Sequence, residues 1–146
     1  MTVSEMSARM TEHGLRPTPQ RLAVYDYLLR HRTHPTAEEI FAAVREQNPS
    51  VSMTTVYNVL RALSEAGLCR TLTIDAEERH FDAGMEDHAH LRCRVCGHIW
   101  DASLGRVECG CEAVAPGFRE EQRELYIFGV CAACFEKEED AQNPSA

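Results

Sequence analysis

The spacing of apolar residues predicts helices in the first half of the chain. After Thr18-Pro19, apolar side chains recur every three or four positions, and a hydroxyl N-cap followed by proline is typical of a helix start. The members of this apolar face are Leu22, Tyr25, Leu28 and Leu29. A second helix is predicted to begin at the capping box Thr36-Ala37-Glu38-Glu39 and to end at Asn48-Pro49.

A third helix, predicted over about Met53–Ala66, separates an apolar stripe from a polar face. The stripe consists of Val56, Val59, Leu60 and Leu63. The opposite face carries hydrogen-bonding side chains without a carboxylate, namely Thr54, Tyr57, Asn58 and Arg61. Gly67 ends the helix, and two strands over Leu68–Ile74 and Arg79–Asp82 follow, joined by a polar turn. Helices followed by a hairpin are typical of a winged helix-turn-helix domain.

The polar face of the third helix has two interpretations. Thr, Asn and Arg are ordinary on a solvated helix surface. An exposed aromatic such as Tyr57, however, has little reason to be there unless it packs against something, for example a thymine methyl group or a sugar, while Arg61 can reach a guanine edge or a phosphate. Arg16 and Arg21 are weaker candidates for phosphate contacts.

The distribution of charge indicates which part of the chain can meet DNA. The formal net charge of −8 argues weakly against a nucleic-acid partner. Residues 1–73, however, hold eight arginines and seven acidic residues, whereas residues 85–146 hold six basic and twelve acidic residues. We therefore expect a DNA-binding domain over 1–84 and a second domain with an acidic tail over 85–146.

The cysteines indicate a structural zinc site. The sequence has no apolar run long enough to cross a membrane, and its polar start lacks a signal-peptide core, so we expect a cytoplasmic protein. Seven cysteines in a reducing compartment indicate metal ligands rather than disulfides. Two C-x₂-C pairs can complete one closed, tetrahedral Cys₄ site in a domain too small for a large core. The four cysteines are Cys93, Cys96, Cys131 and Cys134.

A second group of metal-ligand residues surrounds the first cysteine pair. On an extended segment, His88 and His90 point to the same face, so both imidazoles can meet one ion. The other members are His34, Asp82 and Asp101. Three nitrogens and two carboxylates suit Fe(II) or Mn(II), although hydrogen-bonded surface histidines are the alternative interpretation.

The remaining cysteines and histidines show no such pattern. Cys69 is interpreted as a small buried residue, and the Cys109-Gly110-Cys111 pair as inert thiols rather than a redox or metal pair. The other histidines, which have no neighbours in the sequence that favour a ligand role, are His13, His31, His80 and His98.

Taken together, these motifs resemble the ferric uptake regulator family of metal-dependent repressors. The segments that carry the resemblance are Arg16–Arg21, His34–Glu38, Thr54–Leu60, His88–Cys93 and the two cysteine pairs. The resemblance implies an α+β homodimer with an N-terminal winged helix-turn-helix domain and a small C-terminal α/β dimerisation domain. It also implies a double-stranded DNA operator with an inverted repeat.

Within this family the sequence is most similar to the peroxide-stress regulators. The resemblance implies that His34, Asp82, His88, His90 and Asp101 hold the regulatory ion. Iron-sensing members usually carry Glu at the position of Asp101 and often an acidic residue at the position of Ala89. The implied mechanism is that the ion joins the two domains as a corepressor, and that iron-catalysed oxidation of His34 or His88 by hydrogen peroxide releases the DNA.

Two other functions fit parts of the pattern. The first is an iron- or zinc-responsive repressor on the same scaffold, which would differ in the metal that restores DNA binding and in its response to peroxide. The second is a metallohydrolase that uses a His/Asp metal and a bound water. The sequence offers no separate general base for an enzyme, and the Tyr57 and Arg61 face would then have no purpose.

Overall fold

The computed structural model describes residues 1–106, 108 and 110–143. The chain forms two compact units, Met1–Met85 and Glu86–Ala146. None of the helices in the described ranges is long and apolar enough to cross a membrane.

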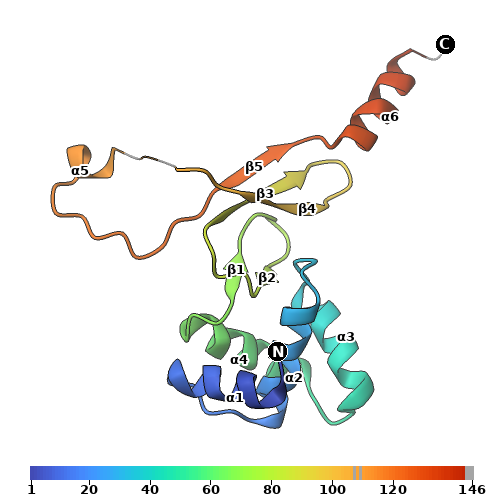
Figure 1. Cartoon of the computed structure of the whole chain (residues 1–146). Helices are drawn as coiled ribbons and strands as arrows, with labels where there is room; N and C mark the ends of the chain where they lie inside the picture. Colours follow the sequence, from blue (N-terminus) through green and yellow to red (C-terminus); the bar gives the residue numbers. More distant parts are fainter. Residues whose placement is uncertain (107, 109, 144–146) are drawn as a thin grey trace. The chain divides into compact units, whose positions relative to one another are not determined.

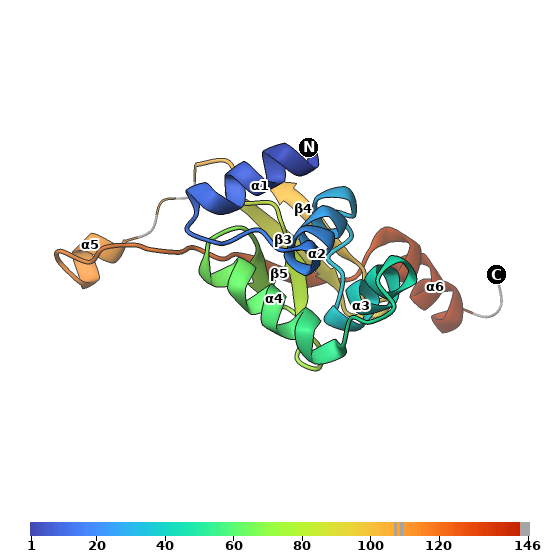
Figure 2. The ribbon, with the colours of Figure 1, turned by 90° about the horizontal axis from the view of Figure 1, so that it is seen from below.

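The N-terminal unit is built from α1 (Val3–Glu12), α2 (Pro19–Arg30), α3 (Ala37–Gln47) and α4 (Met53–Glu65) around one apolar core (Figure 1). Figure 2 shows these helices from below, with α2 packed against α1, α3 and α4. The predicted caps are confirmed: the Thr18 hydroxyl accepts from the Arg21 amide, and Thr36 and Glu39 form a capping box.

Helix α1 was not predicted by the apolar spacing, because its inward face contains few apolar residues. Its N-cap Thr2 forms a capping box with Glu5, and the buried side chains of Met6 and Met10 pack into the core. Two long, flexible methionine side chains suffice to attach this helix to the other three.

The predicted hairpin is present but shorter than expected. Strand β1 (Arg70–Leu72) pairs antiparallel with β2 (His80–Asp82), so that Arg70 lies opposite Asp82. Leu68 and Ile74, at the two ends of the predicted first strand, are buried outside the paired segment. Their apolar character therefore reflects packing rather than strand pairing. The helices followed by this hairpin form the winged helix-turn-helix domain that the pattern indicates.

The C-terminal unit is organised around β3 (His88–Cys93), which pairs antiparallel with β4 (Ile99–Ser103) and parallel with β5 (Tyr126–Gly129) (Figure 1). The described helices of this unit are α5 (Cys111–Val114) and α6 (Ala132–Gln142). The acidic run after Phe135 belongs to α6.

The strand register gives the two faces of this sheet different chemistry. His90 lies opposite both Asp101 and Tyr126, whereas the next residue, Leu91, lies opposite both Trp100 and Ile127. Because side chains alternate between the faces of a sheet, polar metal-ligand residues share one face and apolar residues the other.

Candidate metal centres and nucleic-acid interface

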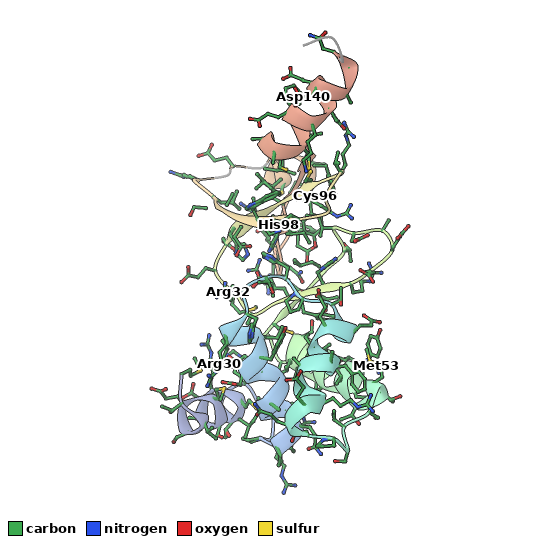
Figure 3. The ribbon with its side chains drawn as sticks, turned by 90° about the vertical axis from the view of Figure 1, so that its right-hand side faces the viewer. Arg30, Arg32, Met53, Cys96, His98 and Asp140 are labelled. Atoms are coloured by element: carbon green, nitrogen blue, oxygen red, sulfur yellow. The ribbon has the colours of Figure 1, made fainter. Side chains whose placement is uncertain are left out.

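The four predicted zinc ligands lie together in the C-terminal unit. Cys93 ends β3, Cys96 lies in the following turn (Figure 3), Cys131 is the N-cap of α6 and Cys134 lies in its first turn. Their Sγ atoms all lie within 4.8 Å of one another, and those of Cys96 and Cys131 are 4.0 Å apart. Sulfur ligands about 2.3 Å from a tetrahedral zinc lie roughly 3.8 Å from one another, so the geometry fits this ion.

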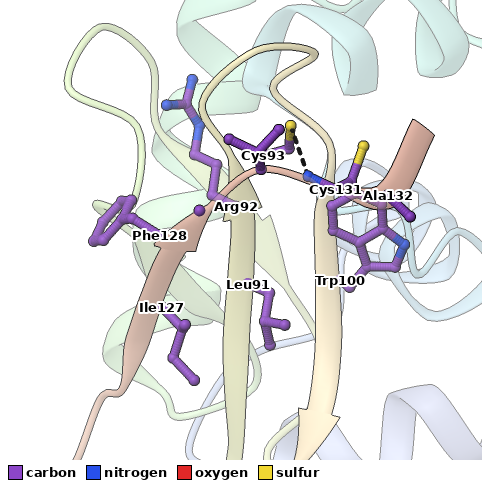
Figure 4. Close-up of a pocket in the computed structure, with 10 residues that line it drawn as sticks. Leu91, Arg92, Cys93, Trp100, Ile127, Phe128, Cys131 and Ala132 are labelled. Carbon is purple, nitrogen blue, oxygen red and sulfur yellow. Dashed lines mark hydrogen bonds between the residues drawn. The ribbon is translucent and has the colours of Figure 1, made fainter. Parts of the chain in front are cut away.

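The surroundings of the sulfur atoms favour the thiolate of Cys93 and disfavour that of Cys134. The Cys131 amide donates to Cys93 Sγ at 3.4 Å (Figure 4), and this bond is the main reason why the pKa of Cys93 is lowered to about 6. The pKa of Cys134 is raised to about 12, mainly because its thiol shares a hydrogen bond with Cys131. Four adjacent thiolates repel one another, so full ionisation of this group requires a cation at its centre.

A second centre is formed by His88, His90 and Asp101 on the polar face of the sheet. The two Nε2 atoms are 3.0 Å apart, and Asp101 Oδ1 lies 3.3 Å from His88 Nε2 and 3.4 Å from His90 Nε2. An ion about 2.1 Å from each donor separates its ligand atoms by roughly 3.0 Å at a right angle and roughly 3.4 Å at the tetrahedral angle. The three donors therefore have the spacing of ligands that share one ion.

Neighbouring groups orient these two imidazoles. His88 Nδ1 lies 2.6 Å from the Glu86 carbonyl oxygen, and because a carbonyl only accepts, Nδ1 donates to it and Nε2 is the nitrogen that faces His90 and Asp101. The buried His90 ring packs edge-on against Tyr126 of β5. No motif in the sequence marks Glu86 or Tyr126, because Glu86 acts through its backbone carbonyl and Tyr126 is placed by a parallel strand pairing.

The N-terminal unit contributes the other two candidate ligands. His34 and Asp82 are buried, and their potential ligand atoms lie within 4.8 Å of each other. Asp82 Oδ1 accepts from the Gly84 amide at 2.8 Å and lies 3.5 Å from Arg32 Nε. Burying a carboxylate beside a buried imidazole costs folding free energy unless charges or hydrogen bonds compensate it. A buried pair of this kind is typical of a functional site.

The polar face of α4 is exposed as predicted, but one residue on it has a partner within the protein. Thr54, Asn58 and Arg61 are exposed, and Tyr57 is 45% exposed. The Tyr57 hydroxyl donates to the Glu38 carboxylate at 2.8 Å, which raises the pKa of Tyr57 and lowers that of Glu38. The hydrogen bond to Glu38 of α3 thus explains in part why Tyr57 lies on the solvent-exposed face of α4, although its ring remains accessible.

The two candidate phosphate contacts differ in their surroundings. The guanidinium group of Arg21 donates to the Arg16 carbonyl at 2.8 Å and is half-buried, so it fixes the backbone ahead of α2. Arg16 is exposed. The structure therefore favours Arg16 over Arg21 as a side chain that can reach a phosphate.

The cysteines and the histidine outside these proposed sites also have definite environments. Cys69 is buried as predicted, and burial raises the pKa of its thiol to about 12. The interpretation of Cys111 as an inert free thiol is wrong, because Cys111, at the start of α5, is disulfide-bonded. Cys109 lies outside the described residues. His80, which no neighbour in the sequence marks as a metal ligand, is half-buried, and its Nδ1 lies 2.7 Å from the His34 carbonyl oxygen.

Comparison with known proteins decides the family. Residues 12–128 match the model of the ferric uptake regulator family. The chain belongs to this family. The peroxide operon regulator of Bacillus subtilis (strain 168) is 39% identical over 139 residues, which are 93% of this chain and 95% of that protein. The peroxide-responsive repressor PerR of Staphylococcus aureus (strain Mu50 / ATCC 700699) is 34% identical over 92% of this chain and 93% of its own.

Solved structures of the ferric uptake regulator family confirm the α+β fold class. The ferric uptake regulator of Helicobacter pylori superposes with a TM-score of 0.73 at 24% identity and covers 92% of this chain and 95% of its own. The peroxide stress regulator of Campylobacter jejuni superposes with a TM-score of 0.65 at 24% identity and covers 92% of this chain and 99% of its own. Because the relatives are named as transcriptional regulators, the metallohydrolase alternative is discarded.

Proposed function

We propose that this ferric uptake regulator family protein is a metal-dependent transcriptional repressor that senses hydrogen peroxide and then releases its operator DNA. The observation that carries the proposal is the group of donors formed by His88, His90 and Asp101, whose spacing fits one shared ion. The names of the relatives, a peroxide operon regulator and a peroxide-responsive repressor, support the peroxide response.

The two candidate centres suit different ions. We assign a structural zinc to the four cysteines, because a closed thiolate site leaves no open coordination position for a substrate or further ligand. We assign Fe²⁺ or Mn²⁺ to the mixed nitrogen and oxygen donors, because these donors are harder than thiolates and less selective among metal ions. The proposed regulatory ligands are His34, Asp82, His88, His90 and Asp101.

The proposed ligands of the regulatory ion belong to both units of the chain. His34 and Asp82 come from the winged-helix unit, and the other three come from the sheet of the C-terminal unit. We propose that both groups bind the same ion, so that binding favours one arrangement of the two units. An ion that binds this arrangement more tightly than others acts as an allosteric corepressor.

Oxidation of a ligand would reverse this effect. Bound Fe(II) would supply an electron to break the peroxide O–O bond and would regain it from the imidazole ring, so that one peroxide oxygen takes the place of the ring hydrogen as a C–OH group and the other leaves as water. The proposed acceptors are His34 and His88, and oxidation of the ring impairs its nitrogen as a ligand. With fewer ligands the ion is released, and the DNA-binding arrangement is no longer favoured.

The partners follow from the exposed surfaces. Helix α4 presents Thr54, Tyr57, Asn58 and Arg61 to the major groove of double-stranded DNA. The apolar face of the sheet supports a homodimer, since Trp100 is 39% and Ile127 is 46% exposed and both line an open hollow with Leu91 (Figure 4). A two-fold dimer would read an inverted repeat.

The direct test of this function measures operator binding anaerobically with Fe(II) or Mn(II), each with and without hydrogen peroxide. We expect both ions to support binding and peroxide to abolish it only in the Fe(II) form. Binding that does not depend on either ion would contradict the metal-dependent repressor. Binding restored by iron but insensitive to peroxide would favour the iron-responsive alternative.

Substitutions on α4 test the DNA interface. Tyr57→Ala and Arg61→Ala should each weaken operator binding by roughly 1–3 kcal/mol if the lost contact is to a base. Tyr57→Phe should have a much smaller effect, because the hydroxyl is already bonded to Glu38 and the ring remains. Fluorescence anisotropy with a labelled operator measures these differences.

Arg45→Ala is the matched control for Arg61→Ala. Arg45 is an exposed arginine in the last turn of α3, where it lies over the Phe41 ring, so its removal changes the net charge equally without altering α4. Zinc content and oligomeric state should be unchanged in all of these variants. If Arg61→Ala and Arg45→Ala weaken operator binding equally, the loss of affinity reflects the lost positive charge alone, and the surface that contacts the DNA bases lies elsewhere.

A further inference from the structure

Strand β2 is attached to the loop that contains His34. His80 Nδ1 lies 2.7 Å from the His34 carbonyl oxygen, and because that oxygen only accepts, Nδ1 carries the proton and donates it. The Phe81 amide donates to the Pro35 carbonyl at 3.0 Å, and Thr36 forms an antiparallel bridge with His80. One side-chain hydrogen bond and the adjoining backbone pairing thus hold this loop against the β1–β2 hairpin, which is the wing of the domain.

The backbone at His34 needs such support. Its φ is +56°, and among the described residues the others with positive φ are glycines. The left-handed region is unfavourable for a residue with a Cβ atom, because this atom approaches the following carbonyl oxygen. A conformation of this kind persists only where its surroundings hold it, and such residues cluster at functional sites.

The same strand also carries the second buried ligand candidate. His80 and Asp82 are two positions apart on β2, so the strand can hold His34 with one side chain and present a carboxylate with the other. The potential ligand atoms of His34 and Asp82 lie within 4.8 Å of each other. The position of the His34 ring relative to Asp82 therefore depends on the backbone that His80 holds.

The His80 ring is oriented from both ends. Its Nε2 lies 3.4 Å from Asp75 Oδ2 in the turn of the wing, and both side chains are 14% exposed. With one nitrogen bonded to a backbone carbonyl and the other facing a carboxylate, the imidazole has a single preferred orientation. A ring fixed in this way is well suited to positioning another residue.

We propose that His80 is a positioning residue that holds His34 in the left-handed conformation from which its imidazole binds the regulatory ion. This inference rests on the proposed function, in which His34 and Asp82 are ligands of that ion. His80 itself acts through the His34 carbonyl. Groups that orient metal ligands in this way typically change metal affinity by about 10- to 100-fold when they are removed.

Three substitutions separate this role from a general structural one. His80→Leu removes both ring nitrogens. His80→Asn retains an amide N–H near the position of Nδ1 and can still donate to the His34 carbonyl, whereas the amide of His80→Gln lies nearer the position of Nε2. His34→Ala tests the proposed function itself. The measurement is the Mn(II) concentration that gives half-maximal operator binding under anaerobic conditions.

We expect His80→Leu and His80→Gln to raise this Mn(II) concentration about 10- to 100-fold. His80→Asn should remain close to the unsubstituted protein, and saturating Mn(II) should restore full operator affinity in every His80 variant. Zinc content and the thermal midpoint should be the same for His80→Asn and the unsubstituted protein. A merely structural role would lower operator affinity at all Mn(II) concentrations.

Two results would overturn the inference. One is a His80→Leu variant with an unchanged Mn(II) requirement while His34→Ala loses its Mn(II) response. The other is a His80→Asn variant that is folded but no better than His80→Leu. An unchanged Mn(II) response in His34→Ala would instead contradict the proposed regulatory site, so the two failures are distinguishable.

Discussion

Replacing Cys96 by serine is expected to release the zinc and unfold the Glu86–Ala146 unit. The described buried apolar side chains of this unit are Ala89, Cys93, Ile99 and Cys134, so half of its small core consists of proposed zinc ligands. A structural zinc site contributes about 10–16 kcal/mol to folding, which is more than such a core can replace. The loss should also dissociate the dimer, because the proposed interface lies on the same sheet.

The experiment measures zinc per chain, circular dichroism and sedimentation. The unsubstituted protein should contain about one tightly held zinc per chain, which is the occupancy of a single closed Cys₄ site. Cys69→Ala is the matched control, since it removes a buried cysteine of the other unit and should leave the zinc in place. A Cys96→Ser protein that is zinc-free yet folded and dimeric would contradict the zinc assignment.

Hydrogen peroxide is expected to oxidise a histidine in the Fe(II) form of the protein and to abolish operator binding. A peptide containing His34 or His88 should gain one oxygen, a mass increase of about 16 Da, because an oxidant formed at the ion reacts with its own ligands before it diffuses away. Loss of a ligand should reduce operator affinity towards the non-specific level, typically by about 10³-fold or more. Peptide mass spectrometry and anisotropy measure the two effects on the same sample.

Two controls accompany this experiment. The Mn(II) form fills the same ligands and should remain unmodified. Asp101→Glu should keep metal-dependent DNA binding and respond more weakly to peroxide, since a longer carboxylate changes the donor spacing at His88 and His90. Unmodified histidines together with oxidised cysteines and loss of DNA binding would contradict the proposed oxidation of histidine. The proposal that the protein is a metal-dependent repressor would be unaffected.

Local patterns in the sequence were enough to predict the helices α2, α3 and α4. Their caps at Thr18 and Thr36 and their apolar faces depend on residues three or four positions apart, which meet in any helix. The short spacing within each C-x₂-C pair likewise predicted that its two sulfurs share one ion. Because a structural zinc ion takes four ligands, two such pairs were predicted to meet. The alternation of His88 and His90 likewise predicted one shared face of a strand.

Contacts between distant parts of the chain were decided only by the tertiary structure. Helix α1 is held by the packing of Met6 and Met10, and the ring of Tyr57 is tied to Glu38 of another helix. His80 meets the backbone of His34, 46 positions away, through a carbonyl group that every residue possesses. No pattern of side chains marks such a contact in advance, because the partner is backbone and the distance is closed only when the wing packs against the loop before α3.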